Sequence, residues 1–415
     1  WTVRPKGAMF RLETRELAMA RGERRLWEGD PSGMSKADRA SGAFETYIPD
    51  PVMGRIVPLA TDTARLLAEA DLAVAGIGWG DRSAHPGDLA GLLLRTEAAA
   101  SSWIEGIPPR ARQVAFAALA QDEDEPKRPG EAARLVANNI HIMRTAVAEM
   151  AGVGALTVKQ LVGLQEDLVL DHRAHGLRRT QNWVGGSPYH PLGAAFVPPP
   201  PEIVQPLLED LAAYLNDVSS PPLVQAGLAH AQFETIHAFP DGNGRVGRAV
   251  IHTVLARRGL TRGAVLPVSL VLMTRQDEYI AGLTAYRHVG PRDGAEAAMA
   301  ANAWLKVFLR AIIDAVEQAQ VFAAEVEMLT ATWRTRLQRH RLEAGKAENP
   351  RSDSATAKLL AGLTQAPVMT NRTAKRVFGV SEPAASAAFA ELTAAGITAK
   401  TRDRHTVVHH VPELL

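Results

Sequence analysis

Apolar residues recur every three or four positions along most of this chain, which is the spacing of helices that bury one face. Residues 1–60 lack this spacing and are polar, with glycine and proline interruptions. Beyond them the spacing predicts helices over residues 63–74, 89–104, 130–151, 157–168, 202–216, 223–236 and 245–258. The pattern therefore predicts a mainly α protein.

The last third of the chain contains a long helical pattern followed by a smaller unit. Residues 293–341 are alanine-rich and keep the helical spacing, either as one helix or as two joined at a break. No apolar heptad persists there, which argues against a coiled coil. A polar, proline-containing linker at 345–354 then precedes two short helices around Gly379 and a strand pair over 398–411, the order of a winged helix-turn-helix.

A short β-hairpin is predicted at 178–201, just before the most informative part of the chain. Residues 182–186 and 195–197 have the composition of two short strands around a turn. Four prolines at 198–201 close the segment.

Composition bounds the size and class of the protein. A chain of 415 residues suggests two or three domains, which we place at 1–122, 123–345 and 355–415. Its 46 basic and 45 acidic residues leave a formal charge of +1, so no global field favours nucleic acid or a membrane as partner. The absence of cysteine excludes disulfides and thiolate chemistry. No apolar run could span a membrane, and residues 1–11 lack a signal-like core, so we expect a cytoplasmic protein.

Residues 237–248 carry the clearest chemical signal. Gly242 and Gly244 permit a tight backbone path whose N–H groups can turn inward towards an anion. The path leads into a predicted helix, whose first N–H groups and dipole favour phosphate. Arg245 and Arg248 lie three positions apart, so they share one helix face and can clamp a polyphosphate.

Three further side chains complete this predicted site. Asp241 offers a hard oxygen ligand, suited to Mg²⁺ that bridges phosphates. His237 precedes the loop and can take a proton from a hydroxyl near neutral pH, while Phe239 is an apolar anchor. Taken singly such residues are usually structural, but together they predict phosphate transfer. The loop is not of the Walker type, because it ends in arginine rather than Lys-Ser/Thr.

Residues 237–248 resemble the Fic family signature, His-x-Phe-x-Asp/Glu-Gly-Asn-Gly-Arg-x-x-Arg, at every defined position. The resemblance implies a Fic-type helical core that transfers AMP from ATP to a hydroxyl of a target protein. It implies that His237 deprotonates this hydroxyl, which attacks the α-phosphate as pyrophosphate leaves. The implied ligand contacts are Asp241 for Mg²⁺, Gly242, Asn243 and Gly244 for the anion hole, Arg245 for the β-phosphate and Arg248 for the γ-phosphate.

Two other segments extend the resemblance to about residues 40–320. The hairpin at 178–201 looks like the family's flap, on which a target protein docks by strand pairing. The alternative is an ordinary surface hairpin. Tyr279 matches part of a segment that the family places near adenine, although Arg275 stands where an asparagine is often found.

Ser101, Glu105 and Gly106 form a second signal upstream. By itself a Ser-x-x-x-Glu pattern before a glycine is an ordinary helix end. Beside the signature it resembles the family's inhibitory motif, Ser/Thr-x-x-x-Glu-Gly/Asn. The resemblance implies that Glu105 pairs with Arg248 and removes the partner of the γ-phosphate. We therefore expect a weakly active resting enzyme whose self-modification increases when Glu105 is replaced.

The C-terminal unit at 355–415 has basic residues, but none on its second predicted helix. The residues suited to phosphate contacts are Lys375, Arg376, Lys400, Arg402 and Arg404. Residues 383–391 contain no lysine or arginine, and reading DNA usually needs such groups on that helix. We therefore favour a docking or dimerising module over DNA binding.

Three functions remain open from the sequence. The leading hypothesis is an autoinhibited protein adenylyltransferase that acts on a Ser, Thr or Tyr hydroxyl. The reverse reaction, removal of AMP by a water that Glu105 positions, would use the same residues. The third is a regulator that binds nucleotide or DNA without transferase activity, although the intact His237 and Arg248 argue against it. The sequence leaves the oligomeric state open, and a homodimer is compatible with it.

Overall fold

The computed structural model describes residues 19–29, 35–36, 38–77, 86–108, 110–122, 130–261, 264–403 and 406–415. Helices dominate this part of the chain, which confirms the predicted mainly α fold. The helices of the main body are α1 (Thr61–Gly76), α2 (Pro86–Ile104), α3 (Ala111–Asp122), α4 (Glu131–Ala148), α5 (Val158–Leu168), α6 (Val204–Asn216), α7 (Pro222–Ile236), α8 (Asn243–Arg257), α9 (Val268–Thr274), α10 (Gln276–Tyr286) and α11 (Ala295–Glu343). None of the helices described offers the apolar length that a bilayer crossing needs.

Helices α7 and α8 form the centre of the main body. Every residue of α7 from Leu223 to Ile236 is buried, and so is every residue of α8 from Asn243 to Leu255. A helix that is covered all round must be surrounded by other elements. Helix α4 packs against α8, and α6 and α11 pack against α7. The loop between α7 and α8 is therefore held between two helices that are buried along most of their length.

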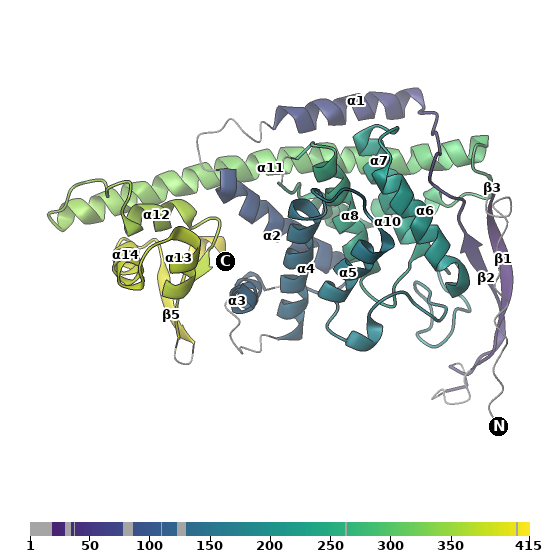
Figure 1. The fold of residues 1–415 in the computed structure, drawn as a ribbon, viewed down its shortest axis with the longest axis horizontal. Helices are drawn as coiled ribbons and strands as arrows, with labels where there is room; N and C mark the ends of the chain where they lie inside the picture. The colour runs from purple at the N-terminus through teal and green to yellow at the C-terminus, as the bar shows by residue number, and fades with distance from the viewer. Residues whose placement is uncertain are drawn as a thin grey trace.

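Helix α11 runs along the length of the molecule (Figure 1). It is continuous over 49 residues, so the long pattern at 293–341 is one helix without a break. Its N-terminal half packs against α1, α7, α9 and α10. Its C-terminal half extends beyond the main body to the C-terminal unit.

A small antiparallel sheet lies at the opposite end of the molecule (Figure 1). It contains β1 (Met19–Trp27), β2 (Gly42–Ile48) and β3 (Gly290–Pro291) in the order β2-β1-β3. The sequence did not predict these strands. Strand β1 alternates between more and less exposed positions, but charged residues occupy much of it, so little apolar alternation is visible.

The predicted hairpin at 178–201 is only partly right. Instead of two short strands, the structure forms a single antiparallel bridge between Val184 and Phe196. The following segment pairs elsewhere, because Tyr47 N–H of β2 donates to Val197 O (2.9 Å) and Thr46 Oγ1 donates to Pro198 O (2.5 Å). Consecutive prolines have no N–H groups for a hairpin ladder, which favours docking over strand formation.

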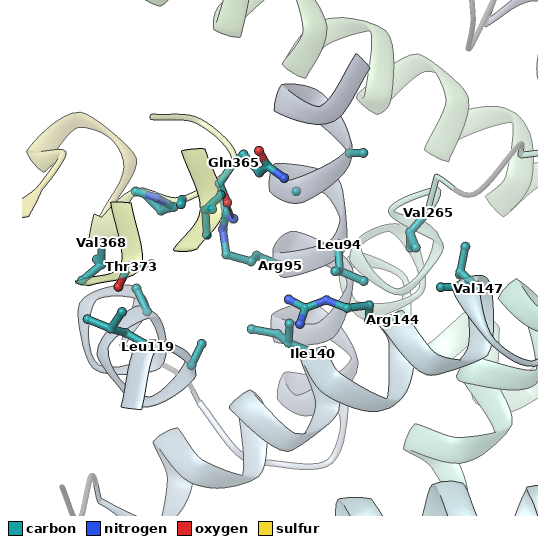
Figure 2. A pocket seen from close by; sticks show the side chains of 18 residues that line it. Leu94, Arg95, Leu119, Ile140, Arg144, Val147, Val265, Gln365, Val368 and Thr373 are labelled. Carbon is teal, nitrogen blue, oxygen red and sulfur yellow. Dashed lines mark hydrogen bonds between the residues drawn. The ribbon is translucent and has the colours of Figure 1, made fainter. Parts of the chain in front are cut away.

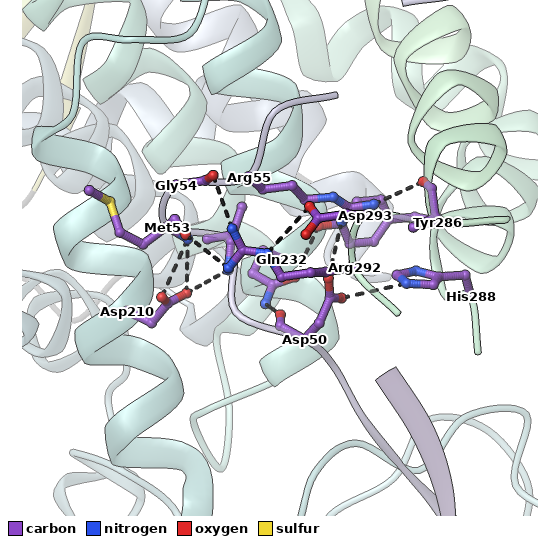
Figure 3. A network of polar contacts seen from close by, with 12 residues as sticks. Asp50, Met53, Gly54, Arg55, Asp210, Gln232, Tyr286, His288, Arg292 and Asp293 are labelled. Atoms are coloured by element: carbon purple, nitrogen blue, oxygen red, sulfur yellow. Dashed lines mark hydrogen bonds and ion pairs between the residues drawn. The ribbon is translucent and has the colours of Figure 1, made fainter. Parts of the chain in front are cut away.

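A buried polar network ties the segment after β2 to the main body (Figure 3). Asp210 of α6 accepts a hydrogen bond from the Val52 N–H at 2.6 Å. Gln232 of α7 donates to the Asp50 carbonyl at 2.9 Å, and Arg55 lies 3.8 Å from the Asp50 carboxylate. These contacts fix β2 beside α7, and β2 in turn holds the end of the 178–201 segment.

The C-terminal unit contains α12 (Ala355–Gly362), β4 (Val368–Met369), α13 (Asn371–Phe378), α14 (Glu382–Ala394), β5 (Ala399–Asp403) and β6 (Thr406–His410). The two predicted helices and the strand pair are present, with sheet order β4-β6-β5. Trp333 and Leu337 of α11 are buried in the core of this unit. Trp333 Nε1 also donates to Glu413 at 2.7 Å. Of the basic residues expected to reach phosphates, Arg404 lies outside the described residues.

Candidate active site

His237 ends helix α7 in an unusual backbone conformation. Its φ of 48° and ψ of 58° are left-handed, and no other non-glycine residue in the described part of the chain has a positive φ. Its N–H still donates to Phe233 O at 3.0 Å, so the helix closes normally before the chain turns. A strained residue persists only where its surroundings impose the geometry, and such residues gather at functional sites.

Two residues of the 178–201 segment impose this geometry. Arg178 Nε donates to the His237 carbonyl at 2.8 Å, and the Arg178 N–H donates to Ala238 O at 3.0 Å. Asn182 Nδ2 donates to the carbonyls of His237 (3.3 Å) and Phe239 (3.1 Å). Sequence reasoning missed both residues, because nothing in the pattern of 178–201 shows that two of its side chains reach the loop.

Asn243 braces the loop from the other side. Its Oδ1 accepts from the Phe239 N–H at 2.9 Å, and its Nδ2 donates to the Phe239 carbonyl at 2.8 Å. The side chain of Asn243 is thus used within the loop, and its place in an anion hole stays a prediction that concerns its backbone N–H. Gly242 adopts a φ of 88°, which an L side chain would strain. The next N–H groups open α8, where a helix offers them no acceptor of its own.

Arg245 is a buried cation with unused hydrogen-bond donors. Its side chain is 2% exposed, and neither Nε nor Nη1 has a hydrogen-bond partner in the described part of the chain. Its Nη2 lies 3.5 Å from Oδ1 of Asp241, whose side chain is 58% exposed. Burial lowers the pKa of Arg245, although the Asp241 charge opposes this. Such a group is costly unless an anion joins it.

Arg248 is held by helix α2 through two of its three nitrogens. Its Nε donates to Ser101 Oγ at 2.9 Å and its Nη2 to the Ser101 carbonyl at 2.7 Å. The same Nη2 donates to Glu105 Oε1 at 2.8 Å. The contact expected between Glu105 and Arg248 is therefore present. Burial by itself raises the pKa of Glu105, but the charge and hydrogen bond of Arg248 outweigh it, so this pKa is lowered.

A second, deeper contact holds α2 against α8. Glu97 lies two turns before Glu105, and its Oε1 is 2.7 Å from His252 Nε2. Glu97 also accepts from Ser269 of α9, through Oε2 from the N–H (2.7 Å) and through Oε1 from Oγ (2.6 Å). Glu97 and Ser269 are completely buried, and His252 is almost so. The sequence offered one signal, a glutamate two turns before Glu105 that is followed by three alanines.

The surroundings shift the pKa values of two groups, Glu234 on α7 and His237 directly after it. Burial, together with the charge of Arg178, lowers the pKa of His237 to about 4, so its imidazole is neutral at pH 7. Burial raises the pKa of Glu234 to about 7, and the Glu105 charge adds to this while Arg248 opposes it. Glu234 Oε1 has no hydrogen-bond partner in the described residues. Sequence reasoning did not identify Glu234.

Tyr279 lies in the core behind Arg248 rather than at an open surface. Only 4% of it is exposed, and its hydroxyl is 2.8 Å from His230 Nε2. Its ring stacks on His230 and lies near Trp304. A contact with adenine stays a prediction, and the position indicates a support for the centre of the site.

A metal ion would find one exposed carboxylate here. Within the described residues no group of three or more His, Asp or Glu side chains gathers to hold a metal. Asp241 is exposed at the mouth of the loop, and the hydrogen bonds described for it use Oδ1. This arrangement fits Mg²⁺, which is usually held by one or two carboxylates together with substrate phosphates.

The fold and the site define a helical protein in which His237, Asp241 and two buried arginines are gathered on the loop between α7 and α8 and on the first turns of α8. Residues 155–255 match the model of the Fic/DOC family, so the chain contains a Fic domain. A "probable protein adenylyltransferase" of Aquifex aeolicus is 36% identical over 92 residues, which cover 22% of this chain and 26% of that protein. The protein adenylyltransferase fic-1 of Caenorhabditis elegans is 34% identical over 106 residues, which cover 25% of this chain and 18% of that protein.

The chain thus spans about a quarter or less of the length of these curated relatives. Among solved structures, a Fic family protein from Desulfovibrio desulfuricans G20 matches 86% of this chain and 97% of its own, with 20% identity and a TM-score of 0.47. A Fic domain containing signaling protein from Bacteroides thetaiotaomicron matches 63% of this chain and 97% of its own, with 18% identity and a TM-score of 0.46.

Proposed function

We propose that this protein is an autoinhibited protein adenylyltransferase that moves AMP from ATP to a Ser, Thr or Tyr hydroxyl of a target protein. The observation that carries the proposal is the state of the two arginines of α8. Arg245 is buried with two nitrogens unused, whereas Arg248 is held by Ser101 and Glu105. Arg245 can therefore bind a phosphate directly, whereas Arg248 is already bound by the carboxylate of Glu105.

The loop and the start of α8 suit the phosphates of ATP. The backbone N–H groups of Asn243, Gly244 and Arg245 come before the first helical hydrogen bond, which Val246 donates to Gly242, and they lie at the positive end of the helix dipole, which favours negative charge. Arg245 offers its two unused nitrogens to the β-phosphate. Arg248 would bind the γ-phosphate only after Glu105 has released it, because its Nη2 is already used.

Asp241 would hold Mg²⁺ together with the α- and β-phosphates. When bound, this ion would supply positive charge against the negative phosphate oxygens. Asp241 is suited to this because its side chain is more than half exposed at the mouth of the loop.

His237 would act as the general base. The target hydroxyl gives its proton to the neutral imidazole while its oxygen bonds to the α-phosphorus. The bond between that phosphorus and the oxygen bridging to the β-phosphate breaks, and pyrophosphate leaves. The low pKa of His237, about 4, makes it a weak base without ligand. Nearby phosphate charge raises the pKa of an imidazole, so nucleotide binding would strengthen the base.

Glu105 would keep the resting enzyme weakly active. A hydrogen bond between charged groups is worth about 1.5–3 kcal/mol. The side chain of Glu105 is 35% exposed, so we expect the lower part of that range. Competition of this size reduces productive nucleotide binding about tenfold.

The target protein would dock on residues 178–201. Arg178 and Asn182 of this segment hold the carbonyls of the His237 loop, so a chain bound here would lie close to the base. Val184 and Tyr189 are among the exposed large apolar side chains, at 43% and 40%. They can receive apolar side chains of an extended target segment.

The experiment is self-labelling from ATP that carries the label on the α-phosphate. We expect weak labelling of the wild type, strong labelling of Glu105→Gly and none of Glu105→Gly/His237→Ala. Equal labelling of the wild type and Glu105→Gly would overturn autoinhibition. Labelling that persists in the double variant would overturn the role of His237. Glu149→Gly is the control for a general effect of losing a surface glutamate, because Glu149 is exposed on α4's C-terminal end.

The reverse reaction, removal of AMP from a modified protein, is the second candidate. One observation favours it: Glu105 is partly exposed and close enough to His237 for the His237 charge to affect its pKa. A carboxylate in this position could orient a water. An AMP-modified protein incubated with the wild type and with Glu105→Gly separates the two activities, since removal would require Glu105 and transfer would not.

A further inference from the structure

A cavity of about 320 Å³ lies between the main body and the C-terminal unit (Figure 2), and none of its lining residues belongs to 237–248. Helices α2, α3 and α4 form one side, and residues 365–368 with α13 form the other. The volume is at the lower end of the range for small-molecule sites. Apolar side chains form much of its wall, including Leu94, Leu119, Ile140, Val147, Val265 and Val368.

Two arginines, Arg95 of α2 and Arg144 of α4, also line this cavity. Figure 2 shows them entering the same space from the two helices. Arg95 donates to backbone carbonyls of the C-terminal unit, at 2.9 Å to Gln365 and at 2.7 Å to Thr364. Arg144 makes no hydrogen bond or ion pair with any residue that the structure describes. Neither guanidinium is paired with a described carboxylate.

The two positive charges affect one another. Burial and, as a smaller cause, the charge of Arg144 together lower the pKa of Arg95 to about 10. Arg144 is exposed at the edge of the cavity and Arg95 is half-buried. An anion between the two guanidinium groups would offset the repulsion between their charges. A guanidinium presents a planar fork of donors that matches a carboxylate. The donors of Arg144 are available for such a group, whereas those of Arg95 are shared with the carbonyls.

We propose that this cavity is a binding site for a small organic anion. Its carboxylate would lie on Arg144 with Arg95 beside it, and its apolar chain would lie along Leu94, Ile140 and Val147. No residue of the His237 site lines the cavity, so binding here is independent of the proposed transferase activity. Arg95 lies on helix α2, which also leads to the inhibitory Glu105. A ligand here would therefore contact both this helix and the C-terminal unit.

The chemistry of the wall separates an organic anion from inorganic phosphate. Phosphate would satisfy the arginines but would leave the apolar side chains uncovered. A neutral alcohol would cover the apolar side chains but would leave both charges uncompensated. Only a molecule with both parts matches the whole cavity.

The test is calorimetric titration of the full chain with sodium octanoate, 1-octanol and inorganic phosphate. We expect saturable binding of octanoate, and binding of the other two weaker by about tenfold or more. Arg144→Gln should weaken octanoate binding by a similar factor. Arg134→Gln is the matched control, because Arg134 is an exposed arginine of α4 that does not line the cavity. It should bind octanoate as the wild type does.

A second variant tests the apolar part without changing charge. Ala90 lines the cavity and is half-buried, so Ala90→Met would fill part of the space and weaken octanoate binding. Circular dichroism and melting curves check that each variant is folded. The proposal is overturned if octanoate shows no saturable binding at millimolar concentration, if octanol or phosphate binds as tightly, or if folded Arg144→Gln binds like the wild type.

Discussion

A Cβ atom on Gly244 would lie 2.0 Å from Oε1 of Glu105 and 3.0 Å from Nη1 of Arg248. Glu105 therefore reaches Arg248 only because the first turn of α8 has no side chain at this position. The same turn presents unpaired N–H groups and the positive end of the helix dipole. The carboxylate of α2 thus occupies a place that favours anions in general, which is why it can compete with a phosphate.

The first prediction concerns this close approach. In Gly244→Ala the new methyl group forces the Glu105 side chain away from Arg248. The inhibition of self-labelling by Glu105 should therefore be lost. We expect Glu105→Gly to raise self-labelling strongly in the wild-type background and much less in the Gly244→Ala background. Rates of labelling from α-labelled ATP measure this non-additivity.

Gly163→Ala is the matched control for that cycle. Gly163 lies in α5, and a Cβ there would meet nothing within 4 Å. It should leave the effect of Glu105→Gly unchanged. Full additivity of Gly244→Ala and Glu105→Gly would contradict the close contact.

The second prediction concerns the buried contact of Glu97. Glu97→Ala would leave His252 and Ser269 without their acceptor, and a buried unsatisfied donor costs about 1–3 kcal/mol. We expect a loss of unfolding free energy of about 3 kcal/mol and faster self-labelling, because α2 would no longer be fixed against α8. Urea unfolding measures the first effect.

Glu97→Gln keeps an acceptor oxygen at the same place, so it should lose less stability than the alanine variant. If the two variants lose stability equally and self-labelling does not change, Glu97 has no part in positioning Glu105 against Arg248.

The third prediction is a pH dependence that Glu234 imposes on stability. Its pKa is about 7 in the folded chain and 4.5 in the reference state. Between these values the folded chain holds a proton that the unfolded chain has lost, so stability falls as pH rises. Glu234→Gln should match the wild type below pH 4.5 and exceed it by about 2–4 kcal/mol above pH 7.

His237 contributes with the opposite sign. Its pKa is lowered to about 4, so its contribution to stability increases as pH rises from 4 to its ordinary value of 6.5. This contribution is the same in the wild type and in Glu234→Gln, so it cancels when their free energies of unfolding are subtracted. Unfolding curves across the pH range give that difference, and a constant value at every pH would show that Glu234 is not protonated in the folded chain.

The fourth prediction concerns the base itself. The imidazole resonances of His237 should titrate near pH 4 in the free protein. Adding ATP to Glu105→Gly should raise this pKa by about one unit or more, because phosphate charge favours the imidazolium. Adenosine, which has no phosphates, is the control and should leave the pKa in place. A shift with adenosine alone would point to a change of burial instead.

Much of the site could be predicted because it is contiguous. His237, Asp241 and the residues that open α8 lie in one segment, where two glycines and a helix start define the local geometry. The long helix over 293–341 was predictable for the same reason, since its signal is local periodicity. The N-terminal strands were missed, because β1 carries charges where apolar alternation would have revealed it.

The sequence by itself determined the chemical groups of the loop and the glycine turn that leads into α8, because both follow from residue types close together in the chain. Tertiary structure decided which groups are used and which remain available. In the folded chain Arg248 donates to Ser101 and Glu105. Arg245 is buried with unused donors, and Arg178 donates to the carbonyl of His237. These outcomes depend on burial and on contacts between helices distant in sequence, and neither is encoded in the spacing of one segment.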